Sequence, residues 1–373
     1  MTPVHDVAIV GAGLLGLAAA RSAAARGLDF VVLEQAAIGH SGSGSKGSCR
    51  IFRLGYPEPG YVQAARQAAG LWHELEEQTS RPILLPAPHL TFGPELSAVH
   101  EAMTQAGAPC EALSAGEAAE RFPQIRTGGP ALLETESGVL AADVALAALG
   151  AAAGLLDPAD PAGRAGPQGA LLRTGVRVTG VADDGRQVTL QTTAGAVIAR
   201  TAILTAGPGT AGLLAGNLAV PTTPTLEQVV YLEPAGEPDP APIFIRHGEP
   251  SPYGLPVPGS DRYKIGLHHS GPVADANADD QSPDPALVAQ LAEIAAQYLP
   301  GYRAEPAATE RCVYDNTPTE DPIIDRIGNV IIGCGTSGHG FKFGPLFGEW
   351  LTALAADGDL PAGGAIRERL RLG

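Results

Sequence analysis

The sequence predicts an α/β fold with α+β elements, in which a parallel, doubly wound sheet is interleaved with a β-rich second domain. Three observations lead to this prediction. The chain opens on an apolar run that leads into closely spaced glycines, its middle changes to short β-runs separated by turns, and its last apolar run ends in a second glycine-rich loop. Because strands of the first type occur near both ends, the two domains are expected to interleave.

The first element is a Rossmann-like strand, turn and helix. Asp6–Val10 is an apolar run of strand type, and Gly11, Gly13 and Gly16 follow it at G-x-G-x-x-G spacing. The first glycine permits a tight turn, the second lets the backbone approach a pyrophosphate, and the third lets the helix pack closely on the strand. The phosphates would then lie at the helix N-terminus.

A second strand is expected at Asp29–Leu33, parallel to the first and ending in Glu34. A carboxylate at that position accepts hydrogen bonds from the adenosine ribose and favours a free 2′-hydroxyl over a 2′-phosphate. A lone G-x-G-x-x-G is a weak signal in a chain with 48 glycines, but here strand, helix, second strand and acid are in register. The pattern predicts a bound dinucleotide and leaves FAD and NAD as alternatives.

Length and composition restrict the class of protein. A chain of 373 residues is long enough for two domains, and 45% hydrophobic with 17% charged residues is a globular composition. The 24 basic and 40 acidic residues give a formal charge of −16, which argues against binding nucleic acid or an anionic membrane. An anionic substrate would therefore need local cations.

Targeting and metal-binding signals are weak. The N-terminal MTPVHDVAIV lacks a basic region, so no secretory signal is expected, and the longest apolar run, Val144–Leu156, is too short to span a bilayer. The four cysteines form no C-x-x-C pair and no metal-ligand spacing, which predicts a cytoplasmic protein without a metal site. These cysteines are Cys49, Cys110, Cys312 and Cys334.

A small-residue loop follows the first unit. Gly39–Gly47 is either a flexible turn or a loop that presents N–H groups to phosphates. Arg50 and Arg53 come next, and they would share a face if their segment were helical. Tyr61–Gln78 has helical periodicity that places Trp72 in the core.

Extended and helical segments alternate through the next part of the chain. The predicted elements are an extended Pro82–Gly93, short helices at Glu95–Ala106 and Ser114–Arg121 (the second with a Ser114/Glu117 capping box), a strand with a turn at Ala131–Leu140, a helix at Ala142–Gly154 and a surface loop at Asp157–Gly169.

From Val176 the pattern is mainly β. We expect a small three-stranded sheet, a return to the parallel sheet with LTAGPG (Leu204–Gly209) against the nucleotide, strands at Gln228–Leu232 and Ile243–Ile245, a hairpin at Pro252–His269, a helix at Pro285–Leu299 and a last strand at Asn329–Cys334. We assign 1–85, 140–218 and 308–373 to the nucleotide-binding domain, and 86–139 and 219–307 to the substrate domain.

Motifs near the C-terminus identify a family. Cys312 lies in RCVYDNTPTEDPIID and Lys342 in CGTSGHGFKFGP; an isolated cysteine is more often a small buried hydrophobe. With VGAGLLG, CRIFRLGY and YGLP, these motifs make the chain resemble the monomeric sarcosine oxidase and N-methyltryptophan oxidase family of the D-amino-acid-oxidase superfamily, nearly end to end. The resemblance implies the D-amino-acid-oxidase fold.

The resemblance also implies a flavin. FAD is expected to be covalently bound through a thioether from Cys312, with Arg50 against the flavin ring and the Gly335–Gly340 backbone against its pyrimidine edge, where donors raise its electron affinity. The expected cofactor contacts are Gly11, Gly13, Gly16, Glu34, Ser45, Lys46, Arg50, Val176, Gly207, Cys312, Gly338, His339, Gly340 and Lys342.

The substrate residues follow from the same likeness. Arg53 and Lys342 resemble the pair that holds the substrate carboxylate, and two cations in a dry pocket would capture an anion despite the acidic surface. Lys264 matches a lysine that activates oxygen electrostatically, and His268, four residues on, would share its strand face. The expected catalytic residues are Lys264, His268, Arg50 and Tyr314; the expected substrate-binding residues are Arg53, Lys342, Tyr253 and Phe244.

The chain departs from the family pattern at a few positions. Ser45 and Lys46 replace paired histidines, Ser48-Cys49 replaces Asp-Thr, and Phe244 stands where sarcosine oxidases have a methionine. Lys46 would add a cation beside the flavin edge.

The resemblance implies an FAD-dependent oxidase of a secondary α-amino acid, such as sarcosine or another N-methyl amino acid. Hydride would pass to the flavin, the imine would hydrolyse, and O₂ would become H₂O₂. The alternatives are a cyclic imino acid of the pipecolate or proline type, a fructosyl-amino-acid oxidase, an amine dehydrogenase with another acceptor, and a flavoprotein without turnover. The expected partners are the amine and O₂, and the expected state is a monomer.

Overall fold

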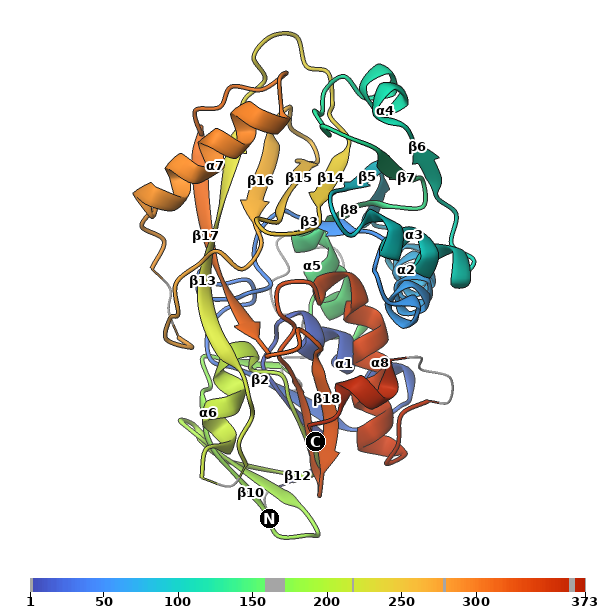
Figure 1. Ribbon diagram of the computed structural model, residues 1–373. Helices are drawn as coiled ribbons and strands as arrows, with labels where there is room; N and C mark the ends of the chain where they lie inside the picture. Colours follow the sequence, from blue (N-terminus) through green and yellow to red (C-terminus); the bar gives the residue numbers. More distant parts are fainter. Residues whose placement is uncertain (1–2, 158–171, 217, 278–279, 362–365, 373) are drawn as a thin grey trace.

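Two eight-stranded sheets and one three-stranded sheet form the framework of the described chain, which in this computed structural model comprises residues 3–157, 172–216, 218–277, 280–361 and 366–372. Figure 1 shows the two large sheets one above the other, with both chain ends in the lower part. The predicted loop Asp157–Gly169 lies, apart from its first residue, outside the described residues. Within the described ranges, no helix is long and apolar enough to cross a membrane.

The first sheet is built around β1 (Val4–Val10). This strand pairs in parallel with β2 (Phe30–Glu34) on one side and with β12 (Gly195–Leu204) on the other, which confirms the parallel pairing predicted for the first two strands. β12 also pairs in parallel with β19 (Val330–Cys334). Strands from both ends of the chain therefore share one sheet.

The remaining strands of this sheet are β9 (Leu172–Thr174), β10 (Val178–Asp183), β11 (Val188–Thr192) and β18 (Ile323–Ile327). The three-stranded sheet predicted after Val176 is not a separate sheet. β12 is one ten-residue strand whose first half pairs with β11 and whose second half pairs with β1. The meander is therefore continuous with the parallel sheet, because β12 has no break between its two halves.

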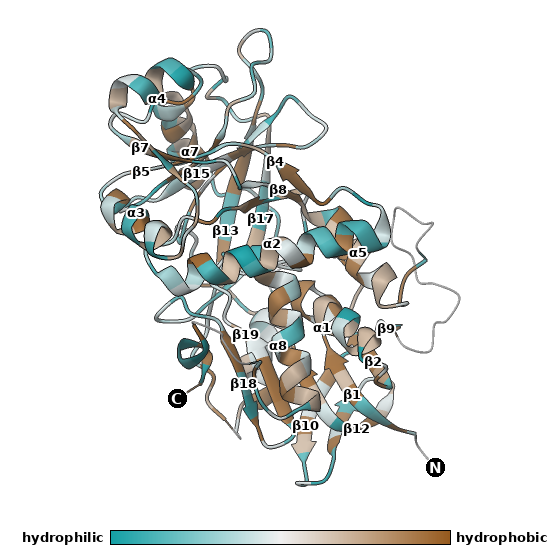
Figure 2. Cartoon of the chain, turned by 90° about the vertical axis from the view of Figure 1, so that its right-hand side faces the viewer, coloured by the Kyte–Doolittle hydropathy of each residue, from teal (hydrophilic) through white to brown (hydrophobic). Residues whose placement is uncertain are grey.

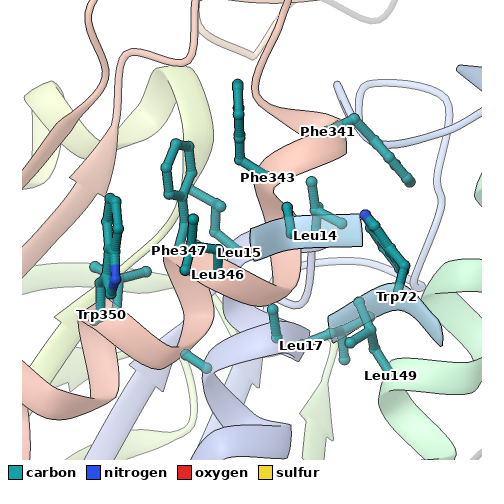
Figure 3. Close-up of a cluster of buried hydrophobic side chains, with 14 of the residues drawn as sticks. Leu14, Leu15, Leu17, Trp72, Leu149, Phe341, Phe343, Leu346, Phe347 and Trp350 are labelled. Atoms are coloured by element: carbon teal, nitrogen blue, oxygen red, sulfur yellow. The ribbon is translucent and has the colours of Figure 1, made fainter. Parts of the chain in front are cut away.

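Helices pack against the first sheet and enclose the largest core. α1 (Leu14–Ala25) crosses α8 (Gly344–Ala356) closely, because a Cβ at Gly348 would lie 2.4 Å from the Ala18 backbone carbon. Figure 3 shows Trp72 beside Phe341 in this core, at 6.2 Å between ring centroids, which confirms the predicted burial of Trp72.

Three further α-helices and three 3₁₀ turns have the following bounds: α2 (Pro59–Thr79), α5 (Ala142–Ala152), α6 (Thr210–Leu214), η1 (Gly207–Gly209), η2 (Phe341–Phe343) and η3 (Arg367–Leu370). Figure 2 shows hydrophilic and hydrophobic residues alternating along α2, as its helical periodicity predicts.

The second sheet has the strand order β17, β13, β16, β15, β14, β5, β7, β6. Their bounds are β17 (Ala308–Asn316), β13 (Thr223–Leu232), β16 (Tyr263–Leu267), β15 (Pro252–Pro256), β14 (Ile243–Arg246), β5 (His89–Phe92), β7 (Ala131–Glu134) and β6 (Glu111–Leu113). The helices of this part are α3 (Leu96–Gln105), α4 (Ala115–Arg121) and α7 (Pro285–Tyr298), and α4 begins with the predicted capping box. The long pair β13 and β17 reaches down toward the first sheet (Figure 1).

A small sheet of β3 (Cys49–Phe52), β8 (Gly138–Ala141) and β4 (Leu84–Pro86) lies between the larger ones. The segment that carries Arg50 is therefore a strand and not a helix. The predicted strand Ala131–Leu140 is divided between two sheets, because β7 pairs with β5 and β6 whereas β8 pairs with β3 and β4.

The interleaving places segments of distant sequence in each sheet. β17 (308–316) is hydrogen-bonded to β13 in the second sheet, although residues 308–373 were assigned to the nucleotide-binding domain. The exact domain boundaries stay a prediction. β17 shares a sheet with strands of the predicted substrate domain, although it follows the predicted boundary at residue 308.

Candidate active site

A cavity of about 620 Å³ opens at the carboxyl ends of β1 and β2, which is where open α/β sheets bind nucleotides. Nine of the predicted cofactor contacts line it. These nine residues are Gly11, Gly13, Glu34, Ser45, Arg50, Val176, Gly207, Gly338 and Gly340.

Gly11 and Gly16 show the turn and packing geometry expected of the first and third glycines. Gly11 has a φ of +97°, and a Cβ there would lie 2.5 Å from the Thr205 backbone oxygen. A Cβ at Gly16 would lie 1.9 Å from the Gly11 oxygen, so α1 could not pack against the turn with a larger residue. The backbone of this turn is therefore left open toward the cavity, as a bound pyrophosphate requires.

Glu34 is buried, and backbone N–H groups orient its carboxylate. Its Oε2 accepts a hydrogen bond from Ala12 N at 2.8 Å and its Oε1 from Ala36 N at 2.9 Å. Ser45 Oγ accepts from Leu14 N at 3.0 Å in the first turn of α1. The glycine turn, the helix N-terminus and the acid together fit the adenosine diphosphate half of FAD.

A second cavity of about 460 Å³ adjoins the first. Arg50, Tyr314, Gly338 and Phe341 line both cavities, so one elongated ligand could contact both. The predicted flavin-linked Cys312 lines the second cavity. This cavity also brings together all the predicted substrate and catalytic residues except Phe244: Arg50, Arg53, Tyr253, Lys264, His268, Tyr314 and Lys342.

Arg50 is held between the two cavities by backbone oxygens. Its guanidinium donates to Cys49 O at 2.9 Å and to Gly44 O at 3.1 Å, and its Cζ lies 5.5 Å from the centroid of the Phe341 ring. The loop before β3 and the loop before α8 therefore position this cation where the cavities meet.

Arg53 and Lys342 both contact Tyr56, which was not predicted as a site residue. Lys342 Nζ donates to Tyr56 OH at 2.8 Å and to His339 O at 2.6 Å, and the Arg53 Cζ lies 4.0 Å from the Tyr56 ring centroid. The only signal for Tyr56 is its place at the end of the CRIFRLGY motif.

This pair of cations is suited to an anion. Burial and the charge of Arg53 hold the pKa of Lys342 well below its ordinary value. The buried NH1 of Arg53 has no hydrogen-bond partner among the described residues. A carboxylate would supply that partner and would favour the charged form of Lys342.

Lys264, Cys312 and two tyrosines form the other side of the second cavity. Lys264 is buried on β16, and its Nζ donates to Cys49 O at 3.4 Å. Cys312 is a free thiol on β17, and burial raises its pKa. Tyr314 packs on the glycine-rich loop so closely that a Cβ at Gly338 would lie 2.0 Å from its ring.

His268 belongs to a cluster of two histidines and one glutamate at this cavity. Its ring stacks on His269 with centroids 3.9 Å apart, and Glu320 lies 3.7 Å from His268 Nε2 and 3.3 Å from His269 Nδ1. Burial lowers the pKa of His268, whereas the hydrogen bond to Glu320 raises that of His269. The three side chains offer atoms within 4.8 Å of one another, a spacing that acidic clusters often show without a metal ion. Glu320 was not predicted as a site residue.

Phe244 was wrongly placed in the pocket wall. Its side chain is fully buried and packs against Phe92, Tyr263 and Tyr298 in the core of the second sheet. Its neighbour Ile245 lines the second cavity instead. Successive residues of a strand face opposite sides, so an error of one position moves the side chain to the other face.

Two other predicted cofactor contacts point elsewhere. Lys46 lines neither cavity, and its Nζ donates to Gln281 Oε1 at 2.7 Å. His339 faces the second cavity and not the nucleotide, with Nδ1 3.3 Å from Tyr56 OH. Burial and the nearby Lys342 lower the pKa of His339 to about 3, so the imidazole is neutral. Gly340 lines the nucleotide cavity as predicted, whereas Cys312 and Lys342 line only the second.

Comparisons with known proteins identify the family of the chain. A sequence profile of the family described as FAD dependent oxidoreductase matches residues 6–354. The chain is 32% identical over 379 aligned positions to the peroxisomal sarcosine oxidase of Mus musculus, covering 95% of this chain and 93% of that protein. It is 30% identical over 373 positions to the N-methyl-L-tryptophan oxidase of Salmonella newport, covering 95% and 94%. These likenesses confirm the resemblance predicted from the motifs.

Solved structures share the fold. The chain superposes on NikD, an unusual amino acid oxidase essential for nikkomycin biosynthesis, with a TM-score of 0.85 at 24% identity, covering 99% of this chain and 98% of that one. For the L-proline dehydrogenase of P. horikoshii the TM-score is 0.82 at 20% identity, with 100% of both chains covered. At such identities the likeness concerns the fold alone, and it confirms the predicted D-amino-acid-oxidase type.

Proposed function

The chain belongs to the family of FAD dependent oxidoreductases, and from that premise we propose that it oxidises a secondary α-amino acid, sarcosine or another N-methyl amino acid, with O₂ as the electron acceptor. The observation that carries the proposal is the cation pair Arg53 and Lys342, of which Arg53 has a buried N–H group without a partner in the described chain. This pair lies in a cavity that adjoins the nucleotide site.

Each residue of the second cavity has its own role in the proposed reaction. Arg53 and Lys342 hold the carboxylate, and Tyr56 keeps the two cations apart by accepting from Lys342 and stacking under Arg53. His268 is neutral because burial lowers its pKa, so it can accept a hydrogen bond from the substrate amine without repelling it. FAD held by the nucleotide cavity would supply a two-electron acceptor for the hydride on the carbon next to nitrogen and a route for the electrons to O₂. Lys264 adds a buried positive charge where oxygen is reduced.

The substrate class is supported by the relatives. Two of them are named for sarcosine and N-methyltryptophan, and the sarcosine oxidases of several organisms match over most of this chain. For sarcosine the overall reaction is amine plus O₂ plus water to glycine, formaldehyde and H₂O₂. A dehydrogenase with another acceptor is the second candidate, because the same fold occurs in an L-proline dehydrogenase and a fold does not determine the acceptor.

Peroxide yield separates these two functions. Incubation with sarcosine in air is expected to give one H₂O₂ for each amine oxidised, measured together with O₂ uptake. Turnover that needs an artificial dye and gives no peroxide would identify a dehydrogenase.

We also propose that FAD is covalently attached through Cys312, which lines the second cavity as a free thiol. Acid precipitation of the purified protein is expected to leave the flavin absorbance in the pellet. Cys312→Ser is expected to move the absorbance to the supernatant, whereas Cys110→Ser, a free thiol that lines neither cavity, leaves it in the pellet. Flavin released from the unmodified protein, or retained by Cys312→Ser, would refute this attachment.

We further propose a monomer in the cytoplasm. Relatives at 29% identity carry the name monomeric sarcosine oxidase, and all four cysteines are free thiols, as in a reducing compartment.

A further inference from the structure

A buried carboxylate contacts the backbone between Arg53 and Tyr56. Glu134, the last residue of β7, is fully buried. Its Oε2 accepts hydrogen bonds from Leu54 N at 2.8 Å and Gly55 N at 3.0 Å. Its Oε1 accepts from His89 Nδ1 at 2.7 Å and from Thr91 Oγ1 at 3.2 Å. Four donors therefore satisfy a carboxylate that has no access to solvent.

The two backbone donors are the residues between Arg53 and Tyr56. Leu54 N and Gly55 N donate to the same carboxylate oxygen, which fixes two successive peptide planes. These planes set the directions of the neighbouring Arg53 and Tyr56 side chains. The contact requires glycine, because a Cβ at Gly55 would lie 2.4 Å from Glu134 Oε1. The Glu134 carboxylate therefore fits against residues 54–55 only because position 55 is glycine.

The charge on Glu134 is maintained despite burial. Burial raises its pKa, but the charge and hydrogen bond of His89, the Leu54 N–H and the charge of Arg53 together bring it to about 2. In the adjoining cavity Arg53 lowers the pKa of Lys342, so the two cations repel each other. An anion close behind Arg53 offsets part of that repulsion.

We propose that Glu134, held by His89, is a positioning residue for the carboxylate site: it fixes the backbone that carries Arg53 and Tyr56, and its charge partly offsets that of Arg53 beside Lys342. This inference rests on the proposed function, because it assigns Glu134 a role in binding the substrate carboxylate. Glu134 is not a catalytic residue, since it lines neither cavity.

Glu134→Gln tests the proposal in the flavin-loaded enzyme. The amide keeps an acceptor for Leu54 and Gly55 but loses the charge and places a donor near His89. The probes are benzoate and its neutral isostere benzamide, with binding followed by perturbation of the flavin absorbance. We expect Glu134→Gln to raise the dissociation constant of benzoate at least tenfold, to leave that of benzamide within twofold, and to raise the KM for sarcosine far more than it lowers kcat. Glu136→Gln, an exposed carboxylate two residues away, is the matched control and should change neither.

Other outcomes overturn the proposal. Unchanged benzoate affinity in Glu134→Gln, or equal losses for both probes, would mean that the carboxylate has a general structural role. If Glu134→Gln does not fold, His89→Gln gives the same test from the other partner, with the same selective loss expected. A failure of the proposed function is distinguishable, because the unmodified enzyme would then bind benzoate no better than benzamide.

Discussion

Replacing Lys264 by methionine is expected to slow the oxidation of the reduced flavin by O₂ by about 10²–10³-fold, the usual cost of removing one preorganised electrostatic contact. Anaerobic reduction by the amine is expected to stay within about fivefold of the unmodified rate, on the same reasoning that the charge acts on oxygen alone. Lys264 is buried on β16 and shares the second cavity with Cys312. Methionine has a similar length, so the change removes charge with little loss of packing.

Stopped-flow measurement of the two half-reactions tests this role. Lys46→Met is the matched control, because Lys46 lines neither cavity and its Nζ is bound to Gln281. It should leave both half-reactions close to the unmodified rates. Equal losses in both half-reactions of Lys264→Met would refute the assignment of Lys264 to oxygen.

Arg53→Ala is expected to weaken carboxylate binding by about 1.5–3 kcal/mol, roughly 10- to 150-fold in dissociation constant, the range for a hydrogen bond to a charged group. The physical reason is that the buried NH1 of Arg53 has no hydrogen-bond partner among the described residues. A bound carboxylate supplies that partner, and the alanine variant loses this hydrogen bond. Burial is the main cause of the lowered pKa of Lys342 and the charge of Arg53 the second, so Arg53→Ala removes only the second cause and Lys342 retains some affinity for the carboxylate.

Titration with benzoate measures this loss. Arg53→Lys keeps the charge without the planar fork, and it should fall between the unmodified protein and Arg53→Ala. An unchanged dissociation constant in Arg53→Ala would show that Arg53 does not bind the carboxylate.

Local patterns explain how much of the fold could be predicted. The first strand, turn and helix follow from contiguous residues, and the capping box at Ser114 needs only three positions. β18 was missed, because it is recognisable mainly as the hairpin partner of β19. The strand that carries Arg50 was left open, because four residues give no clear period and its partner β8 is far away in sequence.

The candidate site shows the same limit. Residues inside motifs, such as Arg53, Lys264 and Lys342, were found and brought together in one cavity. Glu134 was missed, because its contact with Leu54 spans 80 residues and a carboxylate at a strand end has no distinctive pattern. Phe244 was misplaced, because sequence spacing does not determine which face of β14 points to the cavity.

The central claim is that the second cavity binds an amine with a carboxylate and delivers its electrons to the flavin. The most direct test is anaerobic mixing of the purified flavoprotein with sarcosine, and separately with dimethylamine, while the flavin absorbance is recorded. Sarcosine is expected to bleach the flavin completely, and dimethylamine, which lacks the carboxylate, to leave it oxidised at the same concentration. Equal bleaching by both amines would contradict the carboxylate site, and failure of every N-methyl and cyclic amino acid to bleach the flavin would contradict the proposed function.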